Sequence, residues 1–113
     1  MDIIHNIVIK TRKQFEMNTV DTAMLKKIYG SYTLIPNMDE FVTIALSQFP
    51  KLNCGLTSLY LQYLLQDGEV HSGKYKQENH TFLTIENLII DITADQYGGP
   101  KIYIGSLCEP WLL

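Results

Sequence analysis

The chain has 113 residues, of which 46% are hydrophobic, and its net charge is −3 from nine basic and twelve acidic residues. This length and apolar content predict one globular domain, residues 1–113, with a single core. The densest basic cluster, Lys10, Arg12 and Lys13, is too small to favour nucleic acid as a partner. The apolar runs are shorter than a bilayer span, so we also expect no membrane partner.

The first ten residues contain an early acid and no basic region ahead of a long apolar stretch, so we predict no signal peptide, although the chain could be a piece of a longer secreted protein. Two cysteines, Cys54 and Cys108, exclude a disulfide-rich scaffold and a zinc site built on four cysteines. The three histidines do not fall at metal-ligand spacing, and no phosphate-binding loop or dinucleotide fingerprint is present. We therefore expect no metal and no cofactor.

Helices are expected in the first part of the chain, after a short apolar strand or arm at residues 2–10. Residues 18–29 suit a first helix, and residues 37–49 suit a second whose apolar stripe has helical spacing. A third begins near Cys54 and is apolar nearly all round, which is typical of a central, buried helix. Gly68 is a plausible stop signal for it.

Strands are expected in the remainder, where the hydrophobic period changes from helical to alternating. Residues 80–86, 88–93 and 101–105 have strand patterns, and Glu86-Asn87 can form a two-residue hairpin turn between the first two. The segment 94–100, ADQYGGP, has the strongest turn signal in the chain and is expected to be a loop. Helices followed by strands predict an α+β fold with an antiparallel sheet.

Cys54 stands at the predicted start of the central helix, where free backbone N–H groups and the helix dipole favour a thiolate. The thiolate is the nucleophilic form of cysteine. Gly55, the next residue, allows backbone or substrate to come close. The alternative for Cys54 alone is a buried packing residue, because free cysteine is among the most buried residue types.

The predicted hairpin could supply a base and an orienting group. With Glu86-Asn87 as the turn, His80 and Asp91 share a face and become diagonal neighbours across the two strands. A carboxylate in the apolar run LIIDIT needs a partner, and His80 could be that partner. An imidazole–carboxylate bond would fix the tautomer of the histidine and support its protonated form. The alternatives are a solvent-facing strand histidine and a turn-forming acid.

Gln48, six positions before Cys54, could donate a side-chain hydrogen bond to a developing oxyanion, together with the N–H of Cys54. An exposed glutamine at a helix end is the ordinary alternative.

These residues resemble the papain-like and transglutaminase-like cysteine hydrolase superfamily. The features that carry the resemblance are Gln48 and Cys54-Gly55 ahead of a central helix, and the segment HTFLTIENLIIDITADQY, which is similar to small bacterial members. The resemblance covers about residues 37–105. It implies a minimal papain-like fold, with the cysteine-bearing helix packed on an antiparallel sheet and residues 1–36 as an N-terminal cover or extension.

By this resemblance Cys54 is the nucleophile, His80 the general base and acid, Asp91 the orienting residue and Gln48 part of the oxyanion hole. Gln96 matches the tail motif without an assigned role. Two departures stand out, because the cysteine is followed by Gly-Leu-Thr where papain-type peptidases have a small residue and an aromatic, and the chain is about half the length of papain.

The implied function is amide hydrolysis through a thioester, in a protein glutamine deamidase or a peptidase of bacterial toxin or effector type. The partners would be a protein or peptide substrate and an inhibitory or immunity protein. The location would be the cytoplasm or the interior of a target cell, where thiols stay reduced. Two alternatives are open: a catalytically inactive papain-like binding domain, and a structural disulfide between Cys54 and Cys108. Against the disulfide, we expect Cys108 to have a packing role, in a C-terminal segment whose Trp111 and leucines dock on the core.

Overall fold

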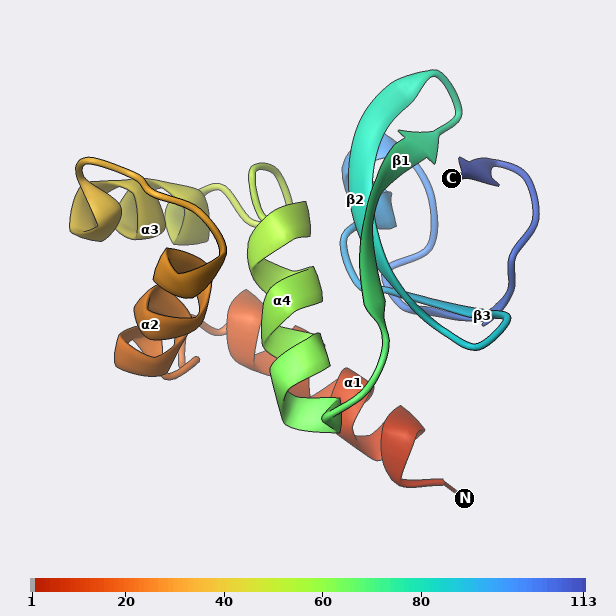
Figure 1. Cartoon of the computed structure of the whole chain (residues 1–113), viewed down its shortest axis with the longest axis horizontal. Helices are drawn as coiled ribbons and strands as arrows, with labels where there is room; N and C mark the ends of the chain where they lie inside the picture. Colours follow the sequence, from red (N-terminus) through yellow and green to blue (C-terminus); the bar gives the residue numbers. More distant parts are fainter. Residues whose placement is uncertain (1) are drawn as a thin grey trace.

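Helices occupy the first part of the chain and strands the second, in a computed structural model that describes residues 2–113 (Figure 1). The helices and strands are α1 (Ile3–Glu16), α2 (Thr22–Tyr32), α3 (Met38–Ser47), α4 (Cys54–Leu65), β1 (Glu69–Tyr75), β2 (Glu78–Ile85), β3 (Leu88–Asp91), the 3₁₀ helix η1 (Ala94–Tyr97), β4 (Tyr103–Ser106) and β5 (Trp111–Leu112). The predicted α+β class is confirmed.

The strands form one curled antiparallel sheet in the order β4-β3-β2-β1-β5. In the β2–β3 hairpin, Leu83 pairs with Ile90 and Ile85 with Leu88. The predicted two-residue turn at Glu86-Asn87 is therefore confirmed, and with it the assignment of His80 and Asp91 to one face.

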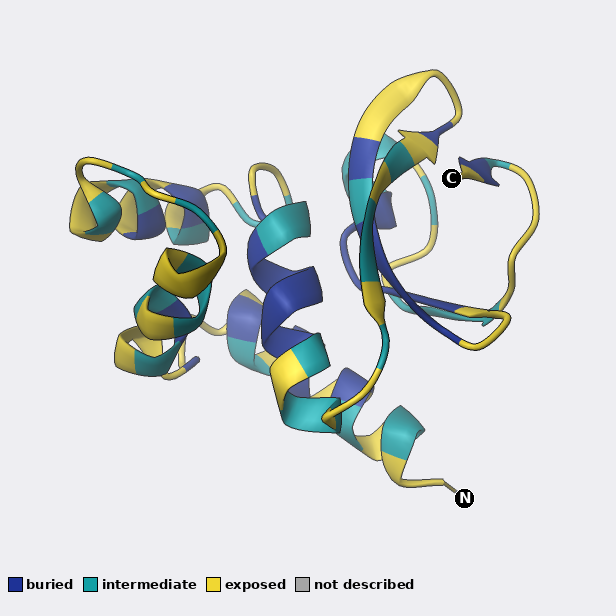
Figure 2. Cartoon of the chain, viewed as in Figure 1, coloured by how far each residue is buried: buried dark blue, intermediate teal, exposed yellow. Residues whose placement is uncertain are grey.

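Helix α4 lies at the centre of the molecule, between α2 and α3 on one side and the sheet on the other (Figure 1). Residues 56–61 are all buried, which forms the dark middle of this helix in Figure 2. Leu56 and Tyr60 join the core among the helices, whereas Leu61 joins the core against the sheet. The prediction of a central, buried helix that carries the cysteine and packs on an antiparallel sheet is confirmed.

The two faces of the sheet contribute side chains to different hydrophobic clusters. Side chains on one face pack with α1 and α4 in a cluster of Val8, Leu61, Leu83, Ile85, Ile90 and Ile92. The other face holds a smaller, aromatic cluster of Tyr75, Phe82, Ile89, Ala94 and Trp111. His80 and Asp91 point toward this second cluster, because residues two apart along a strand share a face.

The prediction of a strand or arm at residues 2–10 is wrong, because these residues begin helix α1. The Asp2 carboxylate accepts the backbone N–H of His5 at 2.8 Å and so caps the helix. The buried positions Val8, Thr11 and Phe15 then follow at helical spacing. The β-branched start of the segment suggests a strand only when it is considered apart from residues 11–15.

The second half also differs from prediction in detail. Strand β1 was not expected, and its half-exposed pattern explains why the sequence signal is weak. The predicted loop 94–100 begins with the 3₁₀ helix η1, and the predicted strand 101–105 is β4 at Tyr103–Ser106. Within residues 2–113, none of the helices has the length and apolar character needed to cross a membrane.

Candidate active site

His80 and Asp91 form a buried pair on the aromatic face of the sheet. His80 Nε2 lies 2.7 Å from Asp91 Oδ2, and the two residues are only 2% and 3% exposed. The contact joins the start of β2 to the end of β3, as the diagonal placement predicts. Such burial requires that both side chains be paired, because an isolated charge in this environment would be strongly unfavourable.

Three further hydrogen bonds fix the Asp91 carboxylate. Its Oδ1 accepts the backbone N–H of Thr93 at 2.9 Å and the Thr93 hydroxyl at 3.3 Å. Its Oδ2, which contacts His80, also accepts the indole N–H of Trp111 at 2.8 Å. Both oxygens are thus occupied by donors, and the carboxylate can serve His80 only as an acceptor.

Aromatic rings surround the imidazole of His80. The rings of Tyr75 and Phe82 have centroids 6.1 Å from it, and the ring of Tyr97 meets it edge-on at 5.5 Å. Nδ1 is buried and has no hydrogen-bond partner among the described residues. Since Nε2 is bound to Asp91, Nδ1 is the nitrogen left to interact with Cys54.

Cys54 is the first residue of α4 and is half-buried. Burial raises the pKa of its thiol, but the neighbouring imidazole of His80 and the backbone of Thr81 outweigh burial and lower the pKa below its usual value. Burial likewise lowers the pKa of His80, but the hydrogen bond to Asp91 and the neighbouring negative charges of Asp91 and Cys54 raise it to about 9. Both shifts act in the direction of a thiolate–imidazolium pair.

Gln48 and Gln96 line a cleft to which neither His80 nor Asp91 contributes. Gln48 is the exposed C-cap residue of α3, and it lines a polar cleft of about 430 Å³ in which Gln96 also takes part. The Nε2 atom of Gln96 is buried and has no hydrogen-bond partner among residues 2–113. The oxyanion role of Gln48 stays a prediction, and Cys54 is not among the residues that line this cleft.

Arg12 of α1 contacts two segments that flank the site, one after β3 and one before α4. Its guanidinium binds both carboxylate oxygens of Asp95 in η1, at 2.8 and 2.9 Å, and donates to the carbonyl of Ile92 at 2.7 Å. It also lies 4.6 Å from the ring centre of Phe49, in the segment that leads to Cys54. This residue was missed as a site component because α1 was not recognised as a helix.

Cys108 does not take part in the site. Cys54 and Cys108 are both free thiols, so the disulfide alternative is not realised in this structure. Cys108 is exposed and lies 3.7 Å from the hydroxyl of Tyr103, which corrects the expectation that it packs in the core. Trp111 is buried as expected, but its hydrogen bond to Asp91 had no signal in the sequence.

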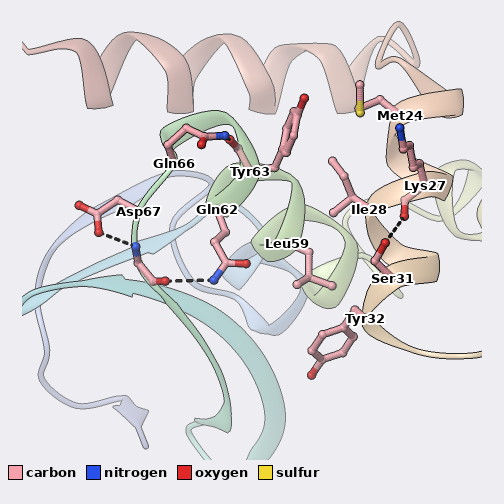
Figure 3. A pocket seen from close by; sticks show the side chains of 11 residues that line it. Met24, Lys27, Ile28, Ser31, Tyr32, Leu59, Gln62, Tyr63, Gln66 and Asp67 are labelled. Carbon is pink, nitrogen blue, oxygen red and sulfur yellow. Dashed lines mark hydrogen bonds between the residues drawn. The ribbon is translucent and has the colours of Figure 1, made fainter.

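A larger groove of about 780 Å³ lies between α2 and the C-terminal half of α4 (Figure 3). Its polar groups are partly satisfied within the chain, since Gln62 donates to the carbonyl of Gly68 and Ser31 to that of Lys27. It contains no cysteine or histidine. In the part of the chain that the structure describes, no three histidine, cysteine or acidic side chains gather as they would around a metal ion.

Comparison with known proteins adds no assignment. No protein-family model, curated protein or solved structure matches this chain. What the protein does is therefore inferred from Cys54, His80 and Asp91 and from their geometry.

Proposed function

We propose that the protein is a cysteine-dependent amide hydrolase. Cys54 is the nucleophile, His80 the general base and acid, and Asp91 the residue that orients His80. The observation that supports this most directly is the buried 2.7 Å bond between His80 and Asp91, which leaves the second ring nitrogen of His80 free. A purely structural pair would have no need of a neighbouring thiol whose pKa is lowered by the same histidine.

The reaction follows from these protonation states. The Cys54 thiolate attacks the carbonyl carbon of an amide, and the His80 imidazolium gives its proton to the departing nitrogen. A thioester remains on Cys54 and His80 is neutral. His80 then takes a proton from water, whose oxygen attacks the thioester, and release of the acid restores the thiolate and the imidazolium. Asp91 accepts a hydrogen bond from His80 throughout.

The proposed fold family is a minimal papain-like domain. Support comes from the arrangement of a cysteine at the start of a buried helix that packs on an antiparallel sheet carrying the histidine and the acid. The proposed substrate is the carboxamide of a protein glutamine, as in a bacterial deamidase toxin or effector, or else a peptide bond. The thioester is common to both, and transfer to an amine instead of water would give transglutamination.

The test is the pH dependence of Cys54 alkylation by iodoacetamide. Cys108→Ser serves as the background, because Cys108 is exposed and would also react. We expect rapid labelling well below the ordinary thiol pKa of about 8.5, and slower labelling at neutral pH in His80→Ala and Asp91→Asn.

A matched histidine is available as a control. His71 on β1 binds the Thr84 hydroxyl at 2.8 Å and does not contact the His80–Asp91 pair, so His71→Ala should leave labelling unchanged. If labelling of the background protein appears only near the ordinary thiol pKa and neither His80→Ala nor Asp91→Asn alters it, the catalytic proposal fails. A binding domain with an unused triad would then be the better description.

A further inference from the structure

Tyr29 of α2 reaches the first turn of α4, beside the nucleophile. A Cβ atom built on Gly55, the residue after Cys54, would lie 3.4 Å from the Tyr29 hydroxyl oxygen and 3.5 Å from its ring carbon Cε1. These contacts are at the lower end of ordinary van der Waals distances, so a side chain larger than a methyl group would displace the phenol. Glycine after the cysteine therefore lets a tyrosine from another helix come close to the site.

The position of the Tyr29 ring is fixed by other aromatic residues. It stacks on Phe41 of α3 with centroids 5.5 Å apart and an angle of 17° between the planes. Tyr32, one turn later on α2, lies against it at 6.2 Å. The phenol is thus held between α3 and α4, and its hydroxyl cannot swing freely away from Gly55.

The hydroxyl of Tyr29 has an unused hydrogen-bonding capacity. By contrast, Tyr97, which packs against the imidazole of His80, donates its hydroxyl to the carbonyl of Asn79 at 3.0 Å. Within residues 2–113 no hydrogen bond involves the hydroxyl of Tyr29, and its oxygen is not fully buried. Burial and the negative charge of Cys54 raise the pKa of Tyr29, so the hydroxyl remains a donor at neutral pH.

We propose that Tyr29 is a catalytic residue whose hydroxyl donates a hydrogen bond to the substrate carbonyl oxygen as Cys54 attacks. The inference rests on the proposed hydrolase function. As the sulfur lone pair forms the C–S bond, the C=O π pair moves to oxygen, and the resulting negative charge needs donors. Tyr29 donates this hydrogen bond without losing its proton. The hydrogen bond weakens when the C=O bond re-forms and the amine, whose nitrogen has received a proton from His80, leaves.

The second donor would be the backbone N–H of Cys54, which is free because it lies in the first turn of α4. A side-chain hydroxyl and a helix N–H then face the same oxygen from two helices. This arrangement gives α2, which belongs to the N-terminal segment 1–36, a part in the chemistry. It also supplies an oxyanion donor in place of Gln48, whose side chain is exposed at the end of α3.

Two reagents that react with the same thiol distinguish this role from packing. p-Nitrophenyl acetate acylates Cys54 through a tetrahedral oxyanion, whereas iodoacetamide alkylates it by direct displacement and forms no oxyanion. Both second-order rate constants are measured in the Cys108→Ser background, with Cys54→Ala as the blank. Thermal unfolding confirms that each variant is folded.

We expect Tyr29→Phe to slow acylation by about 10- to 100-fold, which approaches the loss typical of one oxyanion donor, and to leave alkylation unchanged. Tyr32→Phe is the matched control, because Tyr32 is on the same helix and is 56% exposed. Both of its rate constants should equal those of the background protein.

Either of two results would overturn the role of Tyr29. One is an unchanged ratio of acylation to alkylation in Tyr29→Phe, and the other is a parallel fall of both rates, which would mean that the ring only positions the thiol. Failure of the hydrolase proposal can be distinguished from these results. In that case, alkylation of the Cys108→Ser background protein, in which Tyr29 is intact, would follow the pH profile of an ordinary thiol. The ratio would still be measurable, because any accessible thiol reacts with both reagents.

Discussion

Replacing Arg12 with methionine tests whether the contacts of helix α1 with the segments around the site stabilise the fold. The change keeps an unbranched stem beside Phe49 but leaves the Asp95 carboxylate and the Ile92 carbonyl without their main donor. Removing one partner of a buried ion pair costs about 3–5 kcal/mol. The Asp95 side chain is 18% exposed, so we take the lower end, about 3 kcal/mol, for this pair.

The orphaned Ile92 carbonyl adds about 1 kcal/mol, which brings the expected loss of unfolding free energy to about 4 kcal/mol. For a domain of this size each kcal/mol corresponds to about 4 °C, so the melting temperature should fall by about 15 °C. Urea unfolding followed by circular dichroism gives the free energy, and a thermal scan gives the melting temperature.

Lys13→Met is the matched control for this prediction. Lys13 is the next residue on α1 and is exposed, and its replacement by methionine removes the same positive charge. This replacement should change the unfolding free energy by less than about 0.5 kcal/mol. The reasoning would be refuted if Arg12→Met lost no more stability than Lys13→Met. It would also be refuted if Asp95→Leu failed to recover part of the loss in the Arg12→Met protein, since removing both partners leaves no uncompensated charge.

Two further predictions concern the buried pair. Trp111→Phe removes the 2.8 Å hydrogen bond to Asp91 and should lower the unfolding free energy by about 1–3 kcal/mol in urea titrations; an unchanged value would mean that the bond is not stabilising. The imidazole of His80 should titrate near pH 9 by NMR, and with a lower pKa in Asp91→Asn. Because the folded pKa is raised, the contribution of His80 to stability is present below pH 6.5 and lost as the pH rises through about 9. Cys54→Ala lacks the opposing titration of the thiol, but it also lacks the Cys54 charge that helps to raise the pKa of His80. It should therefore lose stability above pH 6.5 over a narrower range that ends below about pH 9, and a stability that rose with pH would contradict the assignment.

The hairpin was predictable because its register depends on a local feature. Once Glu86-Asn87 is the turn, strand periodicity alone places His80 and Asp91 on one face, and the observed pairs of Leu83 with Ile90 and Ile85 with Leu88 agree. The apolar character of α4 likewise predicts its central place, since a helix without a polar face must be covered on all sides.

The remainder depends on contacts between distant segments, which periodicity does not encode. Trp111 binds Asp91 across 20 positions and Arg12 binds Asp95 across 83. The sequence identifies Trp111 as an apolar residue to be buried, but not which polar group its indole N–H will meet. Arg12 could have been identified as a buried charge only after α1 was recognised as a helix, because it shares the buried stripe of that helix.

The segment DITADQY combines residues of the site with residues that hold the fold. Asp91 binds His80, and Thr93 binds Asp91 through both its backbone N–H and its hydroxyl. Asp95 anchors the segment to the N-terminal helix, and Tyr97 packs edge-on against the imidazole. The backbone turns into a 3₁₀ helix directly after Thr93, so these four side chains, which alternate in sequence, can reach the sheet, the helix and the imidazole. A substitution in this segment can lower thiol reactivity either by altering the site or by unfolding the protein, so reactivity and folding have to be measured separately. The two effects should differ most at Asp95, because its side chain binds Arg12 and not His80.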